Sequence, residues 1–201
     1  RYADIKQAFT SVTALFDQSW YAGYYGMEPK DLFTVIIGCG NGGANYGPST
    51  DFPGDGHHIY AIMGSWSFDS LAKPIFKPAN YLPTLVHEFN HSFINPLLTG
   101  YENNSTLKKS ARKILSVMKE EMASQAYGDW TTLINESLVR ASVVRYQLRK
   151  GSGISDANDE IMMQVNRGFL WTRELVDLLG RYEQNRNQYK TFASFYPEII
   201  K

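Results

Sequence analysis

The pattern of apolar and polar positions separates an early part of the chain with strand-like runs from a later part with helical periodicity. Residues 33–37 and 59–63 are short runs rich in β-branched and aromatic side chains, and a glycine follows each, so they predict two strands of a small sheet. After Asp69 the apolar residues recur mainly at every third or fourth position, which is typical of helices. Strands first and helices afterwards favour an α+β fold.

The first part of the chain also contains expected helices and a glycine-rich connection. Apolar residues at helical spacing predict a helix over residues 2–21. Between the two strands, residues 38–56 include seven glycines and two prolines, which indicates loop or very short irregular strand. A helix is expected over residues 81–95, because Pro83 is tolerated in a first turn and Pro96 disfavours continuation.

Capping residues place the helices of the second part. Asn104 is expected to begin a helix that runs to about residue 127, and Asp129 one that runs to about residue 150. Residues 155–184 read as a further long helix, interrupted near Gly168 or Gly180. No repeat or low-complexity segment divides the chain, so we expect one domain over residues 1–201, with a sheet lobe at about 1–80 and a helical lobe at about 81–201.

Composition excludes several classes of protein. Lys and Arg together number 20, as do Asp and Glu, so the chain lacks the basic excess of a nucleic-acid binder. No apolar run reaches the roughly 18 residues of a membrane span. The single cysteine, Cys39, cannot form an intrachain disulfide, which leaves the redox compartment open. The chain begins at Arg1 without a signal peptide, so we expect a processed or trimmed N-terminus.

A glycine motif follows the first predicted strand. Residues 38–43 match G-x-G-x-x-G, the pattern of dinucleotide-binding sites. Such a site needs a helix that opens at the glycines, because its N-terminus holds the pyrophosphate. The sequence continues Ala-Asn-Tyr-Gly-Pro, which is no helix start, so we expect a loop without a dinucleotide.

The strongest chemical signal is an H-E-x-x-H motif at His87, Glu88 and His91. With 4 histidines in the chain, this pattern is expected by chance only about 0.004 times. Residues i and i+4 of a helix project from one face, so both imidazoles can reach one zinc ion at roughly 2.0–2.1 Å. Glu88 lies one position round the helix and can approach a zinc-bound water without being a ligand.

The residues around the motif predict a buried helix. Between residues 81 and 95 they are largely apolar, and Glu88 is the only charged one. Metal coordination would explain why such a helix buries polar side chains. The alternative is a pair of ordinary core or exposed histidines with a solvated glutamate.

A catalytic zinc needs a third protein ligand and an open position. Cys39, His57 and His58 all precede the motif, whereas Glu136 lies on a later predicted helix. We therefore expect Glu136 to be the third ligand, of one zinc ion per chain. The alternative is a surface carboxylate that pairs with Arg140 at i,i+4.

These residues resemble those of a known enzyme family. Residues 85–91, Leu-Val-His-Glu-Phe-Asn-His, with Asn135-Glu136 on a later helix, are similar to a gluzincin-type zinc metallopeptidase. More narrowly, they resemble an uncharacterised bacterial family of secreted, zincin-like domains. The similarity covers about the middle third of the chain. It departs from the family at Glu136, where Asn-Glu-x-x-x-Arg-Ala replaces Asn-Glu-x-x-Ser-Asp, and no histidine follows His91, which excludes the metzincin pattern.

The resemblance implies a zincin-like fold, with an active-site helix between a small sheet and a helical lobe. It implies zinc held by His87, His91 and Glu136, Glu88 as the general base, and hydrolysis of a peptide or protein substrate. It also implies an extracytoplasmic or secreted location, although a cytoplasmic one stays open.

The resemblance suggests substrate-binding residues as well. In zincins an edge strand beside the active-site helix pairs with extended substrate, and residues 42–47, including Ala44, Asn45 and Tyr46, are the candidate edge here. A plain surface loop is the alternative. Tyr127 is a candidate donor to the oxyanion of the tetrahedral intermediate. Three other residues are open alternatives for that donor: His57, Tyr101 and Tyr146.

Three other functions stay open. One is a metallohydrolase that acts on another amide, and one is a binding module that keeps the fold without turnover. The intact Glu88 speaks against the binding module. The last is a purely structural zinc site, which needs four ligands, and the sequence offers no obvious fourth.

Overall fold

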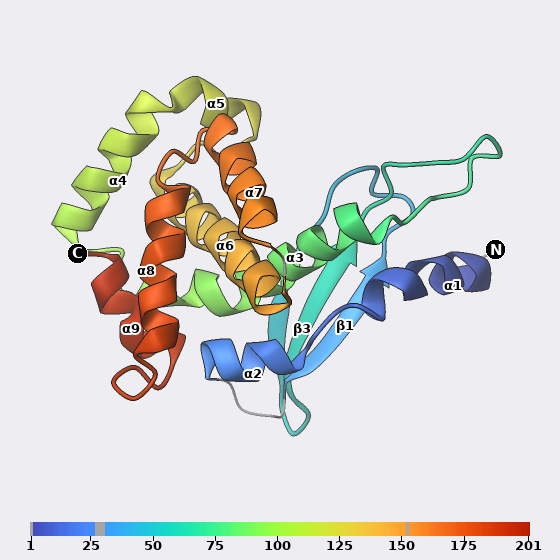
Figure 1. Ribbon diagram of the computed structural model, residues 1–201, viewed down its shortest axis with the longest axis horizontal. Coiled ribbons are helices and arrows are strands. Elements are labelled where there is room, and N and C mark those ends of the chain that lie inside the picture. The colour runs from blue at the N-terminus through green and yellow to red at the C-terminus, as the bar shows by residue number, and fades with distance from the viewer. Residues whose placement is uncertain (1, 27–30, 152) are drawn as a thin grey trace. The chain divides into compact units, whose positions relative to one another are not determined.

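The structure is a computed structural model that describes residues 2–26, 31–151 and 153–201. The described residues form an α+β fold with three strands near the N-terminus and a mostly helical C-terminal part, as predicted (Figure 1). The elements in chain order are α1 (Tyr2–Thr13), α2 (Ser19–Tyr25), β1 (Leu32–Ile37), β2 (Ser49–Phe52), β3 (Gly56–Met63), α3 (Pro78–Thr99), α4 (Ser105–Val117), α5 (Lys119–Ser124), α6 (Trp130–Arg149), α7 (Ile154–Asn166), α8 (Thr172–Gln184) and α9 (Phe192–Ile199).

The chain divides into two compact units, and neither is a continuous stretch of sequence. The first contains residues 1–23 and 27–92, and the second contains residues 24–26 and 93–201. The sequence placed the border between lobes near residue 80, whereas the border of the units falls between Ser92 and Phe93, inside α3. One helix therefore supplies residues to both units.

The sheet of the first unit has the strand order β1-β3-β2. β1 runs parallel to β3, with Phe33 opposite Ile59, and β2 runs antiparallel to β3 on its other side. Both predicted strands are confirmed, and β2 is the short strand that the glycine-rich segment allowed. Alternate residues of β3 are buried, namely Ile59, Ala61 and Met63, so one face of the central strand belongs to the core.

Helix α3 packs on this core through its apolar side. Leu85, Val86 and Phe89 are fully buried, and the rings of Phe89 and Phe33 lie 5.0 Å apart. The Tyr21 hydroxyl donates a hydrogen bond of 3.2 Å to the Val86 carbonyl oxygen. Contacts of this kind fix the strand β1 and the helix that carries the H-E-x-x-H motif in one unit.

The predicted bounds of this helix were too short. α3 begins at Pro78 and runs through Pro96 to Thr99. The helix continues through Pro96 although the missing N–H of this proline removes one helical hydrogen bond.

The prediction of one helix over residues 2–21 was wrong, because this stretch contains α1 and the beginning of α2. α1 closes with i→i+3 hydrogen bonds, from Leu15 N–H to the Val12 carbonyl and from Phe16 N–H to the Thr13 carbonyl. Asp17 then accepts a hydrogen bond of 3.1 Å from the Ser19 N–H and begins α2. An Asx cap competes with continuous helix at such a position, and apolar periodicity alone does not reveal it.

The glycines after β1 form a connection, as expected. Cys39 to Gly43 are turns and bends, and no helix opens there. Tyr46 then forms an antiparallel bridge with Ile62. The G-x-G-x-x-G pattern therefore lacks the helix that a dinucleotide site requires.

The second unit is built around α6, which contacts α4, α7 and α8. The two predicted caps are confirmed: the Asn104 side chain accepts a hydrogen bond from Leu107 N–H, and Asp129 accepts hydrogen bonds from the N–H groups of Thr131 and Thr132. The helix predicted to run to residue 127 ends instead at Val117, and α5 follows.

The break predicted near Gly168 or Gly180 occurs at the first of these. Gly168 has φ +99°, a left-handed conformation that favours glycine, and it lies between α7 and α8. Gly180 lies within α8. Helix α9 was not predicted as a separate element. Among the described residues, none of the helices is long and apolar enough to cross a membrane.

Candidate metal centre

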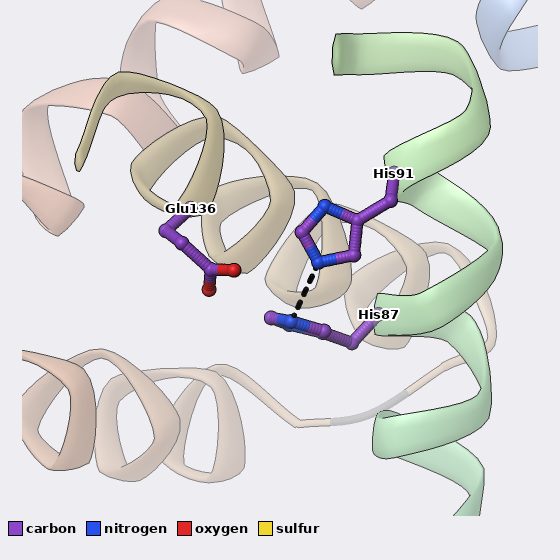
Figure 2. Close-up of side chains that lie close together, drawn as sticks. All are labelled: His87, His91 and Glu136. Carbon is purple, nitrogen blue, oxygen red and sulfur yellow. Dashed lines mark hydrogen bonds between the residues drawn. The ribbon is translucent and has the colours of Figure 1, made fainter. Parts of the chain in front are cut away.

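The two histidines of the motif face each other on consecutive turns of α3. Their Nε2 atoms are 3.1 Å apart, and the ring planes meet at 80° (Figure 2). Two ligands of a tetrahedral zinc at roughly 2.0–2.1 Å would lie about 3.3 Å apart. The spacing of His87 and His91 is therefore close to what a shared zinc ion requires.

Glu88 lies between the histidines in sequence and is buried, with 6% of its surface exposed. Its backbone lies against Gly47, so closely that a methyl group at Gly47 would stand 1.9 Å from the Glu88 carbonyl oxygen. The Ser92 hydroxyl, one turn further along α3, donates a hydrogen bond of 3.4 Å to the Gly47 carbonyl oxygen. The predicted edge segment and the motif helix are thus in direct contact within the first unit.

The expected substrate edge, residues 42–47, pairs with β3 through Tyr46. The N–H and carbonyl of Tyr46 both pair with Ile62, and the Tyr46 side chain is 55% exposed. The Asn45 side chain is engaged in the loop, because its Oδ1 accepts from the Gly64 N–H and its Nδ2 donates to the Gly43 carbonyl. Asn45 therefore shapes this loop.

Glu136 lies on α6, whose first turn is capped by Asp129. It is 7% exposed, so the alternative of a surface carboxylate is wrong. The ion pair that belonged to that alternative does exist, because Arg140 Nη2 donates to Glu136 Oε2 at 3.1 Å. A buried carboxylate paired with a buried guanidinium is the observed arrangement.

Among the residues that the structure describes, one group of His, Cys, Asp and Glu has donor atoms that could hold a metal ion. It consists of His87, His91 and Glu136, with one ligand atom of each within 4.8 Å of the others (Figure 2). The other candidate ligands are absent from the group: Cys39 is exposed, and His57 and His58 form hydrogen bonds with Asp51 and Asp55.

The candidate oxyanion donors Tyr127, Tyr101 and Tyr146 have different neighbours. The Tyr127 hydroxyl accepts a hydrogen bond of 3.0 Å from Arg140 Nη2. Burial, followed by the negative charge of Glu136, raises the pKa of Tyr127, so its hydroxyl stays protonated at neutral pH. Tyr146 is buried, and the Tyr101 ring lies beside Tyr196.

Sequence reasoning missed the wider surroundings of Glu136. Gln164 on α7 is 4% exposed and accepts a hydrogen bond of 2.7 Å from Arg140 Nη1. The i,i+4 spacing of Glu136 and Arg140 indicated a pair, but nothing in the local sequence indicated its burial or the glutamine.

A family described as a domain of unknown function, DUF4932, matches residues 2–201. No curated protein and no solved structure matches.

Proposed function

Because the chain belongs to the DUF4932 family, whose description names no activity, we propose a function from its own residues: a zinc-dependent peptidase. The observation that carries the proposal is the pair of imidazole nitrogens of His87 and His91, 3.1 Å apart on one helix, with the buried Glu88 beside them. We propose that these two histidines and Glu136 hold one zinc ion per chain.

The chemistry of the donor set supports this metal. Two imidazoles and one carboxylate form a three-ligand set of the kind that catalytic zinc sites use, and such a set leaves a coordination position for water or substrate. A structural zinc site would instead be closed by four protein ligands. The ligand group among the described residues has three members, which favours the catalytic class.

Zinc in such a site polarises a substrate carbonyl and lowers the pKa of a bound water to about 7. In the proposed reaction, Glu88 accepts the proton of the attacking water as the general base and passes it to the leaving amine. Its burial on the motif helix supports this role, since a carboxylate shielded from bulk water interacts more strongly with nearby charge.

The proposed substrate is an extended peptide. We propose that it binds along the sheet edge formed by Ala44, Asn45 and Tyr46. This edge is followed directly by Gly47, which packs on the Glu88 backbone. Main-chain hydrogen bonds supply affinity in this kind of recognition. The contact between Gly47 and the Glu88 backbone supports it, because that contact holds the edge and the proposed base in one rigid unit.

The test compares wild type, Glu88→Gln and a control, Glu174→Gln, which changes an exposed glutamate on α8. Zinc content and cleavage of a mixed peptide library are measured for each. Wild type and the control should bind zinc and cleave. Glu88→Gln should bind zinc and cleave at least about 10²-fold more slowly, since general-base catalysis contributes roughly 10²–10⁴-fold.

Two outcomes would contradict the proposal. Zinc-loaded wild type that cleaves no peptide would favour a binding module or a hydrolase of another amide. Cleavage that persists undiminished in Glu88→Gln would remove this residue from the mechanism.

A further inference from the structure

Arg140 is the centre of a buried polar network in the second unit. It is 7% exposed, and its Nη2 donates to Glu136 and to the Tyr127 hydroxyl at 3.1 and 3.0 Å. Its Nη1 donates to Gln164 at 2.7 Å, and its guanidinium carbon lies 4.5 Å from the centre of the Phe169 ring. The guanidinium is thus held at both terminal nitrogens and on one face.

The network continues beyond the guanidinium. Gln164 Nε2 donates to Glu160 Oε1 at 2.6 Å, which fixes the orientation of the amide that accepts from Arg140. Helices α6 and α7, the connection between α7 and α8 that carries Phe169, and the loop before α6 therefore determine where the guanidinium lies. Because the Arg140 side chain is held in one position, its hydrogen bond also restrains the Glu136 carboxylate.

Fold stability gives a weak reason for this arrangement. Buried ion pairs are often no more stable than apolar side chains of similar size, because both charges must leave water. The Arg140 Nε is also buried, and it makes no hydrogen bond with any described residue. Keeping an arginine here at that cost points to a role for its rigid fork of donors.

We propose that Arg140 is the positioning residue of the metal site, which orients the Glu136 carboxylate for zinc. This inference rests on the proposed function, because it assumes that Glu136 is a ligand. Arg140 contacts one carboxylate oxygen, and the surrounding network keeps the side chain from rotating away. Groups that orient metal ligands typically contribute about 10–100-fold to metal affinity.

The experiment measures zinc affinity and unfolding of the zinc-free protein for wild type, Arg140→Met and Arg145→Met. Arg145 is a matched control, because it lies on the same helix and pairs with Glu183. We expect Arg140→Met to bind zinc about 10–100-fold more weakly. Arg145→Met should keep the wild-type affinity even where its stability falls.

A conservative variant guards against a failure to fold. Arg140→Lys keeps the positive charge but cannot hold Glu136, Tyr127 and Gln164 at once, because the ammonium lacks the planar fork. It should fold and bind zinc more weakly than wild type and more tightly than Arg140→Met.

The outcomes separate the two proposals. If Arg140→Met bound zinc as tightly as wild type, the pair of Arg140 and Glu136 would be only structural, and this inference alone would be overturned. If Arg140→Met did not fold, the same result in Arg140→Lys would overturn it. Wild type that binds no zinc would overturn the proposed function and this inference with it.

Discussion

The backbone of Gly47 lies directly against the carbonyl group of Glu88, with room for a hydrogen atom and no more. A methyl group there would stand 1.9 Å from the carbonyl oxygen and 2.7 Å from the carbonyl carbon. Both atoms belong to the backbone of α3, which cannot move aside as a flexible side chain can. This contact fixes the distance between the sheet edge and the motif helix.

Gly47→Ala should therefore destabilise the fold. Overpacking of this kind costs about 1–3 kcal/mol, so the free energy of unfolding in denaturant should fall by that amount. Gly40→Ala is the control, because a methyl group at Gly40 meets nothing within 4 Å. Equal stability of the two variants would show that the edge segment separates easily from α3.

Zinc should bind once per chain and raise the unfolding temperature of wild type. At a free zinc concentration 100 times the dissociation constant, the stabilisation is about 2.7 kcal/mol. His87→Ala should lose stoichiometric zinc, whereas His58→Ala should keep it, because His58 pairs with Asp55 outside the proposed site. Elemental analysis and thermal unfolding check this, and one zinc retained by His87→Ala would place the metal elsewhere.

Glu136→Gln should weaken zinc binding and also lower stability. The amide keeps the size of the carboxylate but is a poorer metal ligand, and it leaves the buried Arg140 without its charged partner. A lost charge-assisted hydrogen bond costs about 1–3 kcal/mol. Cys39→Ser should leave zinc affinity unchanged, since Cys39 is exposed. The reverse pattern in a zinc titration would indicate a cysteine-containing site.

Asp129→Ala should destabilise α6, the helix that carries Glu136. The lost N-cap costs about 0.5–2 kcal/mol at neutral pH. Burial raises the pKa of Asp129, but hydrogen bonds from Thr131 and Thr132 outweigh it and bring the pKa below its ordinary value. The ionised cap therefore stabilises the fold above the unfolded pKa of about 3.9, and this stabilisation is lost as pH falls through the lower folded value.

Urea unfolding of wild type and Asp129→Ala from pH 7 to pH 2 measures this effect. The difference between the two should be constant near neutrality and shrink below about pH 4. Thr106→Ala offers a comparison at the exposed first turn of α4, where no carboxylate cap titrates. A difference that grows in acid would mean that the folded protein raises the pKa of Asp129 instead of lowering it.

Local chemistry made several features predictable. The caps at Asn104 and Asp129 depend on a side chain and N–H groups two or three residues away, and the pairing of His87 with His91 depends on one helical turn. Each of these three features involves residues within a stretch of five consecutive positions. The strands were predictable for the same reason, because their β-branched runs are local.

Features that depend on distant residues were not predictable. The burial of Arg140 requires Gln164, which is 24 residues away, and the close contact of Gly47 with Glu88 joins two different elements. The break between α1 and α2 came from a cap at Asp17 that competes with an apolar pattern typical of one long helix. The periodicity of one sequence does not reveal whether the cap at Asp17 or the continuous apolar pattern determines the local structure.

The interleaved composition of the two units determines when each can fold during synthesis. Tyr24 belongs to the second unit, where the Tyr182 hydroxyl donates to its carbonyl oxygen from 158 residues further along the chain. At about 5–20 residues per second, a ribosome needs on the order of 10–30 seconds to supply that partner. The ring contacts of Tyr24 and Tyr25 with Phe192 likewise form only when the chain is almost complete.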